Sequence, residues 1–509
     1  MIQIPTFLIT LFWVSISITL IVLIYLLTKC VLIPLWVMHS YKKQGVFCQF
    51  FLSSKGVLSR DKEYEASHKD IFGFEKELAK KNNNVPAIVT NFGSRIDITL
   101  LDPKLIKEFY NTPHYSRGFT TTVVNILMGT GLFVAEGDLW KSHRKVISSM
   151  FHFEFLKQCV PLIVDTTREF LDKVTKKDLK GVDIGNEINT ITGEIVGRIF
   201  FSENLSQYDY KGQTLTLYLA GLLTRMTRLF GNSTVMFLYK AGLNLEWASA
   251  YRDFIREIKE FRQYCLKIVQ DRKASGKKNN KDLLGLLLAT QDASNPTEGF
   301  SDEDIISEFI TFFIAGMDST GGLITIILYL LSKNPQYIED LEKEIKAHYN
   351  KTDPPTLDEI NKMEIMHGIV REALRMYNPA PRILQRKATV DHDLLDLKIK
   401  KGMYLRPGPI YNSSNSKYFD EPEKFKPERW LNKKENEVDP FAYIPFSAGA
   451  RNCIGQHLAT IEAKVIVVEF LKMFKFELVP KDYDLVMTMT SIYKPKSKII
   501  MNLEKKKLI

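Results

Sequence analysis

Closely spaced cysteines are missing from this 509-residue sequence. Its five cysteines are isolated from one another, with no CxxC pair: Cys30, Cys48, Cys159, Cys265 and Cys453. Such an odd and scattered set does not make the disulfide framework of a small secreted protein, and it offers no sulfur-rich zinc site. The isolated cysteines therefore indicate a protein that faces the reducing environment of the cytosol.

Internal repeats, a glycine-rich dinucleotide fingerprint and a clustered basic motif are also missing. Without the fingerprint, nothing in the chain indicates a fused nicotinamide- or flavin-binding domain. The lysines and arginines behind the formal charge of +10 are spread along the chain, which argues against nucleic acid and favours an acidic protein or an anionic membrane surface as partner. The content of 45% hydrophobic and 25% charged residues excludes a disordered or collagen-like chain.

Charged side chains are absent from residues 1–28. Within them, residues 4–27 form a near-continuous apolar run, and a helix needs about 20 apolar residues to cross a bilayer core. A cleaved signal peptide would have a shorter apolar region and a charged start, and the first arginine, Arg60, comes too late for an Arg-rich presequence. A buried core helix is the alternative, but core helices rarely stay uncharged for so long. We therefore predict a transmembrane anchor over residues 1–28.

Basic residues follow this predicted anchor and close the chain. Because Lys29, Lys42 and Lys43 come after the apolar run, the positive-inside rule places the bulk of the protein on the cytosolic side. Lys506 and Lys507 resemble a dilysine retrieval signal of endoplasmic reticulum membrane proteins, although a solvated charge run explains them equally well. The expected location is the endoplasmic reticulum membrane.

The longest apolar element of the remaining sequence runs from Ser301 to Lys333. Ser301 and Asp304 form a capping-box start, and Asn334-Pro335 forms a stop. Between them almost no polar face is left, and at 1.5 Å per residue a helix of this length spans about 50 Å. An apolar helix of that length is expected to lie buried through the middle of a domain.

Short alternating, β-branched runs over residues 86–99 and 394–404 indicate small sheets beside the predominantly helical pattern. No long linker divides the chain after residue 45. We therefore predict a mainly α fold with small β-sheets, in which a linker over residues 29–45 leads into one domain over residues 46–509.

The loop around Cys453 carries the strongest chemical signal. Residues 445–455 read Pro-Phe-Ser-Ala-Gly-Ala-Arg-Asn-Cys-Ile-Gly and precede an amphipathic run over residues 458–474. A cysteine at the start of a helix lies where free N–H groups and the positive end of the helix dipole stabilise a thiolate. Gly449 permits a positive φ, and Arg451 can bind a carboxylate through two hydrogen bonds. Taken alone, a cysteine in such a loop is more often an inert buried thiol.

The complete pattern F-x-x-G-x-R-x-C-x-G over residues 446–455 resembles the haem-binding loop of the microsomal cytochrome P450 monooxygenases. This resemblance implies that Cys453 is the thiolate ligand of the iron of a haem b group. It also implies that Phe446, Gly449 and Arg451 bind this cofactor. The implied fold is that of the family, with the haem between the long central helix and the cysteine loop.

Two further haem-binding positions resemble the same family. In Trp140-x-x-x-Arg144 the spacing of four puts an indole N–H and a guanidinium on one helix face, and both are donors suited to a haem propionate. Arg386 follows the Pro379-Ala380-Pro381 break and matches a family position that commonly binds a propionate. The resemblance therefore implies Trp140, Arg144 and Arg386 as cofactor-binding residues.

A structural motif of the family is also matched. Glu372 and Arg375 lie three residues apart on one face of a predicted helix, where an exposed ion pair is the alternative reading. The family buries this pair with a third residue from a Pro-Glu-Arg segment, here Arg429. The resemblance implies a structural role for the triad, behind the haem.

Polar residues interrupt the long apolar helix at Asp318, Ser319 and Thr320. A locally satisfied polar pair that bends the helix is one explanation. In the resembled family an acid–alcohol pair at this place relays protons to bound dioxygen, so Asp318 and Ser319 are the implied catalytic residues and Thr320 shares the hydroxyl role. Serine replaces the usual threonine, which keeps the hydroxyl with a less fixed rotamer. Ala315 offers no carboxylate for a covalent haem ester.

The implied reaction inserts one oxygen atom from dioxygen into a lipophilic substrate, while the other oxygen atom leaves as water. Because this chain carries no flavin domain of its own, its electrons would come from NADPH through a separate membrane-bound NADPH–cytochrome P450 reductase, with cytochrome b5 as a second candidate donor. The expected partners are therefore this reductase, membrane lipid and a lipophilic small molecule, and no nucleic acid. Two alternatives remain at this stage: a haem-thiolate isomerase or dehydratase, and a non-enzymatic haem-binding membrane protein.

Overall fold

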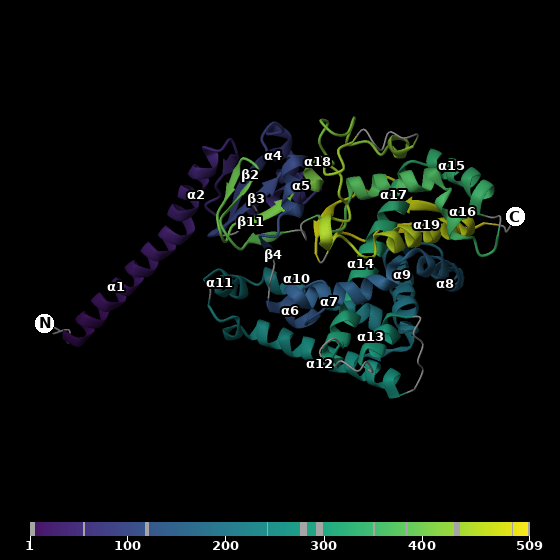
Figure 1. Cartoon of the computed structure of the whole chain (residues 1–509), viewed down its shortest axis with the longest axis horizontal. Helices are drawn as coiled ribbons and strands as arrows, with labels where there is room; N and C mark the ends of the chain where they lie inside the picture. The colour runs from purple at the N-terminus through teal and green to yellow at the C-terminus, as the bar shows by residue number, and fades with distance from the viewer. Residues whose placement is uncertain are drawn as a thin grey trace. The chain divides into compact units, whose positions relative to one another are not determined.

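The described part of the chain is mostly helical and contains several small sheets (Figure 1). This computed structural model describes residues 6–53, 56, 58–117, 122–241, 243–274, 282–291, 299–349, 352–381, 385–431, 438–490 and 492–506. It divides into two compact units, one made of residues 1–118 and 385–411 and the other of residues 119–384 and 412–509. The predicted class, mainly α with small β-sheets, is confirmed.

The first unit contains a six-stranded sheet in the order β1-β2-β3-β11-β8-β4. Its strands are β1 (Phe47–Gln49), β2 (Ala87–Phe92), β3 (Arg95–Leu100), β4 (Tyr115–Arg117), β8 (Arg386–Ala388) and β11 (Tyr404–Pro407). The unit also contains a hairpin of β9 (His392–Leu394) and β10 (Leu397–Ile399). Its helices after residue 57 include α3 (Leu58–His68), α4 (Gly73–Lys81) and α5 (Pro103–Asn111). Strands β2 and β3 are antiparallel, whereas β3 and β11 are parallel. The runs over residues 86–99 and 394–404 thus do form strands.

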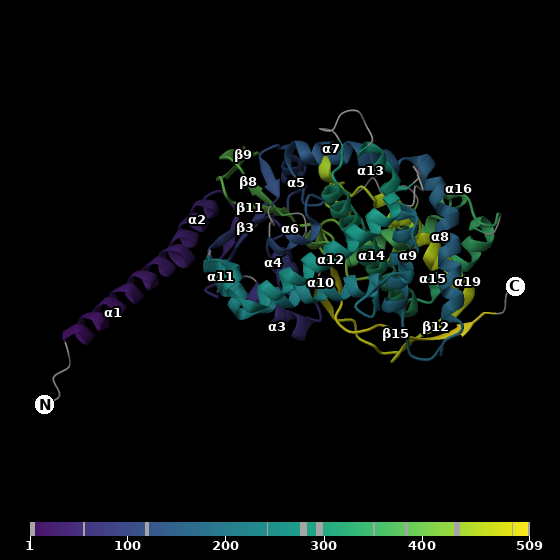
Figure 2. The same ribbon diagram turned by 90° about the horizontal axis from the view of Figure 1, so that it is seen from below.

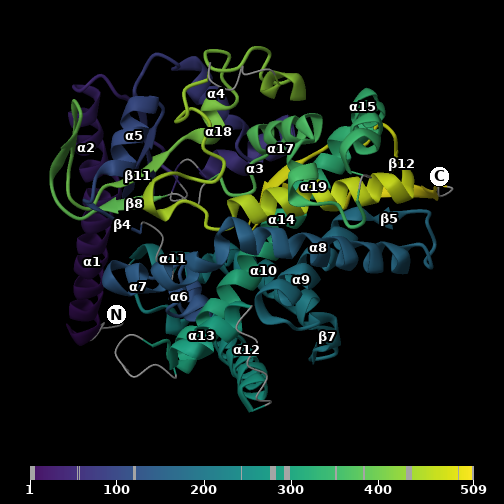
Figure 3. The same ribbon diagram turned by 45° about the vertical axis from the view of Figure 1, so that its right-hand side comes forward.

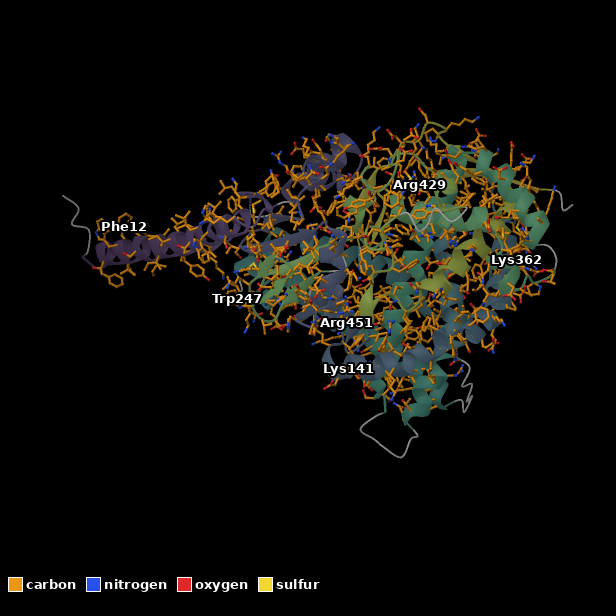
Figure 4. All side chains as sticks on the ribbon, turned by 45° about the horizontal axis from the view of Figure 1, so that its top comes forward. Phe12, Lys141, Trp247, Lys362, Arg429 and Arg451 are labelled. Atoms are coloured by element: carbon orange, nitrogen blue, oxygen red, sulfur yellow. The ribbon has the colours of Figure 1, made fainter. Side chains whose placement is uncertain are left out.

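An uninterrupted helical segment begins the described chain. Helix α1 (Thr6–Leu27) passes through a π-helical turn (Thr28–Leu32) into α2 (Ile33–Lys42). Residues 10–42 are long and apolar enough to cross a membrane, and Phe12 projects outward from this helix (Figure 4). The central helix of residues 302–333 passes the same test of length and composition, but it is mostly buried inside the second unit.

The segment over residues 29–45, which we predicted as a linker, is helical as far as Lys42. Pro34 does not break the helix; it comes two residues after the π-helical turn Thr28–Leu32, where the regular i→i−4 bonding pattern is interrupted. Pro34, Met38 and Tyr41 are spaced on one face and are buried, and α2 contacts β1 and β2. The end of the predicted anchor at residue 28 therefore lies inside a longer helix that is packed on the sheet.

The second unit holds most of the helices. These are α6 (Thr122–Met128), α7 (Gly137–Ser148), α8 (Phe153–Val174), α9 (Ile184–Phe201), α10 (Leu215–Gly231), α11 (Ser233–Ala241), α12 (Ser249–Ala274), α13 (Leu283–Gln291), α14 (Asp302–Lys333), α15 (Gln336–Glu344), α16 (Leu357–Asn361), α17 (Glu364–Met376) and α19 (Gln456–Met473), while α18 (Pro409–Asn412) lies at the division between the units. Of three small sheets, the first has the order β12 (Phe474–Val479), β15 (Ile500–Lys505), β5 (Val182–Asp183). The second pairs β13 (Met487–Met489) with β14 (Tyr493–Pro495), and the third pairs β6 (Asp209–Tyr210) with β7 (Gln213–Thr214). Figure 2 shows β12 and β15 side by side near the end of the chain.

Helix α14 is the predicted long buried helix, and it begins and ends where the sequence indicates. Ser301 is its N-cap and forms the capping box with Asp304, while Asn334 follows its last residue. The helix contacts α9, α12, α17 and α19 (Figure 3). Two glycines let α9 approach closely, because a Cβ at Gly316 would lie 2.7 Å from Val196 and a Cβ at Gly321 would lie 2.0 Å from Asn189.

A buried lysine of α19 predicts a pH dependence of stability. Lys464 is almost fully buried, and this burial lowers its pKa from 10.5 to about 8, although the charge of Glu344 acts in the opposite direction. Below pH 8 both the folded and the unfolded chain hold the proton, so the cost of burying the charge is present in full. Between pH 8 and 10.5 the folded chain releases the proton first, and stability rises with pH.

We expect Lys464→Met to raise the free energy of unfolding at pH 7 by roughly 3 kcal/mol, the order given by the fall in pKa. The gain should shrink as the pH rises from 8 to 10.5, which denaturant unfolding at a series of pH values measures. An equal gain at pH 7 and at pH 10.5 would contradict this explanation.

Candidate active site

The cysteine loop, residues 445–455, is closed by two backbone hydrogen bonds. Cys453 N donates to the Phe446 carbonyl at 2.9 Å, and Asn452 N donates to the Gly449 carbonyl at 3.1 Å. Gly449 has a φ of +69°, a conformation that favours glycine, so the sequence-based expectation for this residue is correct. Gly455 is the N-cap of α19, which places Cys453 directly before a helix N-terminus.

The thiol of Cys453 is accessible although protein atoms surround it. Cys453 is the exposed member of the five cysteines, all of which are described and unpaired. Burial of the sulfur among protein atoms raises its pKa, while the Gly455 amide and the Arg144 guanidinium act to lower it. These two groups favour the thiolate, and a coordinated metal ion deprotonates such a thiol outright.

Helix α7 brings the predicted propionate donors to the cysteine loop. The Arg144 guanidinium donates to the Asn452 carbonyl at 3.1 Å and to Asn452 Oδ1 at 2.9 Å. Arg451 donates to the Ala135 carbonyl at 2.8 Å, and its guanidinium carbon lies 4.3 Å from the centre of the Trp140 ring. The structure therefore gathers Trp140, Arg144 and Arg451 around the loop that carries Cys453.

One face of α14 is accessible in an otherwise buried helix. Of its residues 305–331, all of which the structure describes, Ala315 alone is exposed, and Ser319 and Gly322 on the same face are half-buried. The Ser319 hydroxyl donates to the Ala315 carbonyl at 2.6 Å. Thr320 is buried, so the accessible hydroxyl of the predicted pair is that of Ser319.

Asp318 lies beside this face and is nearly buried. Its Oδ1 is 3.4 Å from the Nζ of Lys494, which comes from β14. The hairpin of β13 and β14 lies against the helix here, since a Cβ at Gly322 would be 2.8 Å from Ile492. Asp318 is thus a carboxylate held by a lysine next to an accessible hydroxyl, an arrangement that can pass a proton to the helix face.

The predicted structural triad is present and fully buried at its centre. Glu372 accepts two hydrogen bonds from Arg375, at 2.9 and 2.8 Å, and one from Arg429 Nε at 2.9 Å. Two further donors were not predicted: Trp430 Nε1 at 2.9 Å and Lys426 N at 3.1 Å. The alternative of an exposed, weak ion pair is excluded for this pair.

Arg386 belongs to β8 of the first unit, where it pairs with Leu405 of β11 and with Arg117 of β4. The other predicted haem-binding residues belong to the second unit. The role of Arg386 at the haem therefore stays a prediction.

Several partners in the site were not predicted from the sequence. Asn452 and Lys494 are examples, since neither the spacing of Asn452 within the loop nor a lysine in a short strand indicates what it binds. His143 is a third: it lies one residue before Arg144 on the buried face of α7, which its spacing of three from Trp140 could have indicated.

The residues of this site fit a thiolate-ligated haem. Such a haem needs an anionic sulfur for its iron and cations or N–H donors for its two propionates. Cys453 supplies an accessible thiol, and Trp140, Arg144 and Arg451 supply the donors. A guanidinium has five N–H donors, so Arg144 can keep its two bonds to Asn452 and still bind a propionate.

Comparisons with known proteins agree with this fit. The family model described as cytochrome P450 matches residues 64–503. Cytochrome P450 4Z1 of Homo sapiens is 27% identical over 82% of this chain and 82% of its own length, and a cytokinin hydroxylase of Arabidopsis thaliana is 30% identical over 69% of this chain and 67% of its own length. The crystal structure of the cytochrome P450DA heme domain has the same fold, with a TM-score of 0.75 and 22% identity over 86% of this chain and 93% of that chain.

Proposed function

The chain belongs to the cytochrome P450 family, and from this membership we propose how its own residues serve a monooxygenase reaction on a lipophilic substrate. Bound haem supplies the iron at which dioxygen is cleaved, so that one oxygen atom enters the substrate and the other leaves as water. The protein's residues have three tasks: to hold the haem, to supply protons, and to admit an apolar substrate while excluding water.

Cys453 is the proposed thiolate ligand. The Gly455 amide and Arg144 favour its anionic form, and Arg144, Trp140 and Arg451 are the proposed propionate donors. Gly449 turns the loop and Phe446 accepts the bond from Cys453 N, so both shape the cofactor side of the loop. Arg386 is proposed as a further propionate donor, on the strength of its match to the family pattern.

The accessible face of α14 is the observation that carries the proposed catalytic roles. Ser319 places a hydroxyl on this face, and its bond to the Ala315 carbonyl fixes the oxygen while leaving its lone pairs to accept a proton donor. The neighbouring residue, Asp318, is the proposed proton source, and its carboxylate is held in place by Lys494. After Asp318 takes up a proton from solvent, its carboxyl can pass this proton to Ser319, while the Ser319 hydroxyl leaves the Ala315 carbonyl and donates its own proton to the reaction space, which is general-acid catalysis.

We expect Asp318→Asn to lower the turnover number about 100- to 1,000-fold, because an amide cannot deliver the proton. Reducing equivalents should still be consumed, so the ratio of product to consumed NADPH should fall. Ser319→Ala should lower the same ratio, whereas Ser319→Thr should preserve it.

The matched control for Ser319→Ala is Ser332→Ala, in which another α14 hydroxyl that bonds a preceding carbonyl, that of Tyr329, is removed. This control should leave the ratio unchanged. If Ser319→Ala and Ser332→Ala behave alike, the proposed relay through Ser319 is wrong.

The proposed electron donor is a separate NADPH–cytochrome P450 reductase, with cytochrome b5 as a second donor. Lys141 and Lys145 are exposed on α7, next in sequence to Trp140 and Arg144, and are suited to an acidic partner. The proposed membrane anchor is the apolar run of residues 1–28, most of which belongs to helix α1. Lys29, Lys42 and Lys43 follow this run and favour a catalytic part on the cytosolic side of the endoplasmic reticulum membrane. Of the proposed retrieval signal, Lys506 is described and Lys507 lies outside the described residues.

Measurement of NADPH consumption by the full-length protein with added reductase tests the proposal. Consumption that a lipophilic substrate stimulates, with a hydroxylated or epoxidised product, is expected over a panel of fatty acids, sterols and aromatic compounds. Turnover of a hydroperoxide without reductase, and no NADPH consumption with any of the panel, would instead favour the isomerase or dehydratase alternative. Haem binding without either activity would favour the non-enzymatic one.

A further inference from the structure

The buried carboxylate of Glu308 joins α14 to the segments that carry the proposed hydrogen-bond donors to the haem propionates. Glu308 lies two turns before Ala315 in the helix and is completely buried. Its Oε1 accepts a hydrogen bond from Leu132 N at 2.8 Å and lies 2.8 Å from Nδ1 of His143 on α7. One carboxylate oxygen therefore holds both a loop amide and a side chain of the donor helix.

The same face of α14 fixes the loop that precedes α7. Thr130 N donates to Ser307 Oγ at 3.2 Å, and the Thr130 hydroxyl donates to Asp304 Oδ1 at 2.5 Å. The backbone lies very close to the helix, since a Cβ at Gly131 would be 2.2 Å from Thr311 Oγ1. The loop of residues 130–132 is consequently held along the helix face by three successive polar contacts, the last of them to Glu308.

This loop and α7 lead directly to the proposed propionate donors. Three residues after Leu132, the Ala135 carbonyl accepts the hydrogen bond of Arg451. His143 lies on the buried face of α7, three residues after the half-buried Trp140, and the next residue, Arg144, reaches the cysteine loop. The Glu308–His143 contact is a direct polar link between this face of α7 and the central helix.

The environment of this link is enclosed and polar groups converge on it. His143 Nε2 is 4.0 Å from Asp304 Oδ1, and its ring stacks on Phe300 with centroids 4.2 Å apart. Burial raises the pKa of Glu308, and its bonds to His143 and Leu132 act against that shift. Water cannot take the place of the carboxylate as hydrogen-bond acceptor here, because Glu308 and His143 are both buried.

We propose that Glu308 is a positioning residue for haem binding: through His143 and the Leu132 amide it fixes α7 and the loop before it, and with them Trp140, Arg144 and Arg451. This inference rests on the proposed function, because it takes these three residues as the propionate donors. Loss of the link should release the donors and leave the Cys453 side of the cofactor unchanged. The expected consequence is faster loss of haem.

The test measures the rate at which the purified full-length holoprotein gives up haem to excess apomyoglobin, together with the free energy of unfolding. Glu308→Leu removes both bonds and should accelerate haem loss about 10- to 100-fold, the usual effect of removing a group that orients cofactor ligands. Glu308→Gln keeps an acceptor oxygen for Leu132 N and should stay within about threefold of the natural protein. His143→Phe keeps the ring beside Phe300, removes one bond and should fall between the two.

Glu344 provides a matched control. It is also a buried carboxylate that ties two segments together, since it accepts hydrogen bonds from Ile365 N at 2.8 Å and Met366 N at 3.0 Å at the start of α17. Glu344→Leu should destabilise the fold to a similar extent and leave the rate of haem loss unchanged. Equal acceleration by Glu308→Leu and Glu344→Leu, or no acceleration by His143→Phe and Glu308→Leu, would overturn the proposal.

These outcomes are separable from a failure of the proposed function. Haem transfer is measured without substrate, reductase or turnover, so it reports on Glu308 even if the monooxygenase assay fails. A natural protein that binds no haem would refute the proposed function itself, before any variant is compared.

Discussion

Cys453→Ala is expected to abolish the red-shifted absorption band that a reduced, carbon monoxide-bound haem-thiolate protein gives. The band depends on electron density that a thiolate donates to the iron, and alanine has no ligand atom. No neighbouring side chain can substitute, because the residues on either side are Asn452 and Ile454 and no other cysteine lies in the loop. The measurement is a reduced carbon monoxide difference spectrum of purified protein, with total haem determined separately.

Cys265→Ala is the matched control for this experiment. Cys265 is fully buried in α12, and burial raises its pKa, so it is a neutral thiol that serves the core. Its removal should leave the red-shifted band in place. A band at the position of imidazole ligation in the natural protein, or a red-shifted band that survives Cys453→Ala, would show that the iron ligand has been assigned wrongly.

Local signals in the sequence predicted the elements that position this site. Ser301 and Asp304 indicated the start of α14 and Asn334 its end, because caps and helix stops are properties of a few adjacent residues. The turn at Gly449 was predictable for the same reason, since its φ of +69° follows from the conformational freedom of glycine. Local chemistry determines such features before the chain is packed.

Partners that are distant in the chain were predicted only where a family pattern supplied them. Spacing alone paired Glu372 with Arg375, and the resemblance added Arg429, but neither indicated the indole of Trp430. The pairing of Asp318 with Lys494 was also not predictable, because it depends on where the hairpin of β13 and β14 packs. Long-range hydrogen bonds follow from tertiary packing, which periodicity does not specify.

Gly316 shows how a functional interpretation can overlook packing. Gly316 lies two residues before Asp318 of the acid–alcohol pair, so its place in the sequence favours a functional role. In the structure it also lies at the crossing with α9, where any larger side chain would meet Val196. A glycine inside a buried helix costs about 1 kcal/mol relative to alanine, and close helix packing is one compensation for that cost.

Glu372→Leu is expected to lower the free energy of unfolding by about 3–5 kcal/mol, the usual effect of breaking a buried ion pair by removal of one partner. The substitution leaves the guanidinium of Arg375, which is almost fully buried, without its carboxylate, and it also removes the acceptor of Arg429 and of the Trp430 indole. Uncompensated charge in the core is costly because water cannot reach it. Denaturant unfolding of the holoprotein measures the loss.

The exposed pair of Arg60 and Glu63 is the matched control, because it has the same residue types at the same helix spacing. Glu63→Leu should leave the free energy of unfolding unchanged, since solvent screens that pair and its side chains are about half exposed. The difference between the two variants measures the effect of burial together with that of the bonds that Glu372 also accepts from Arg429 and Trp430. If Glu372→Leu proved as harmless as Glu63→Leu, the buried triad would not be what stabilises the segment behind the cysteine loop.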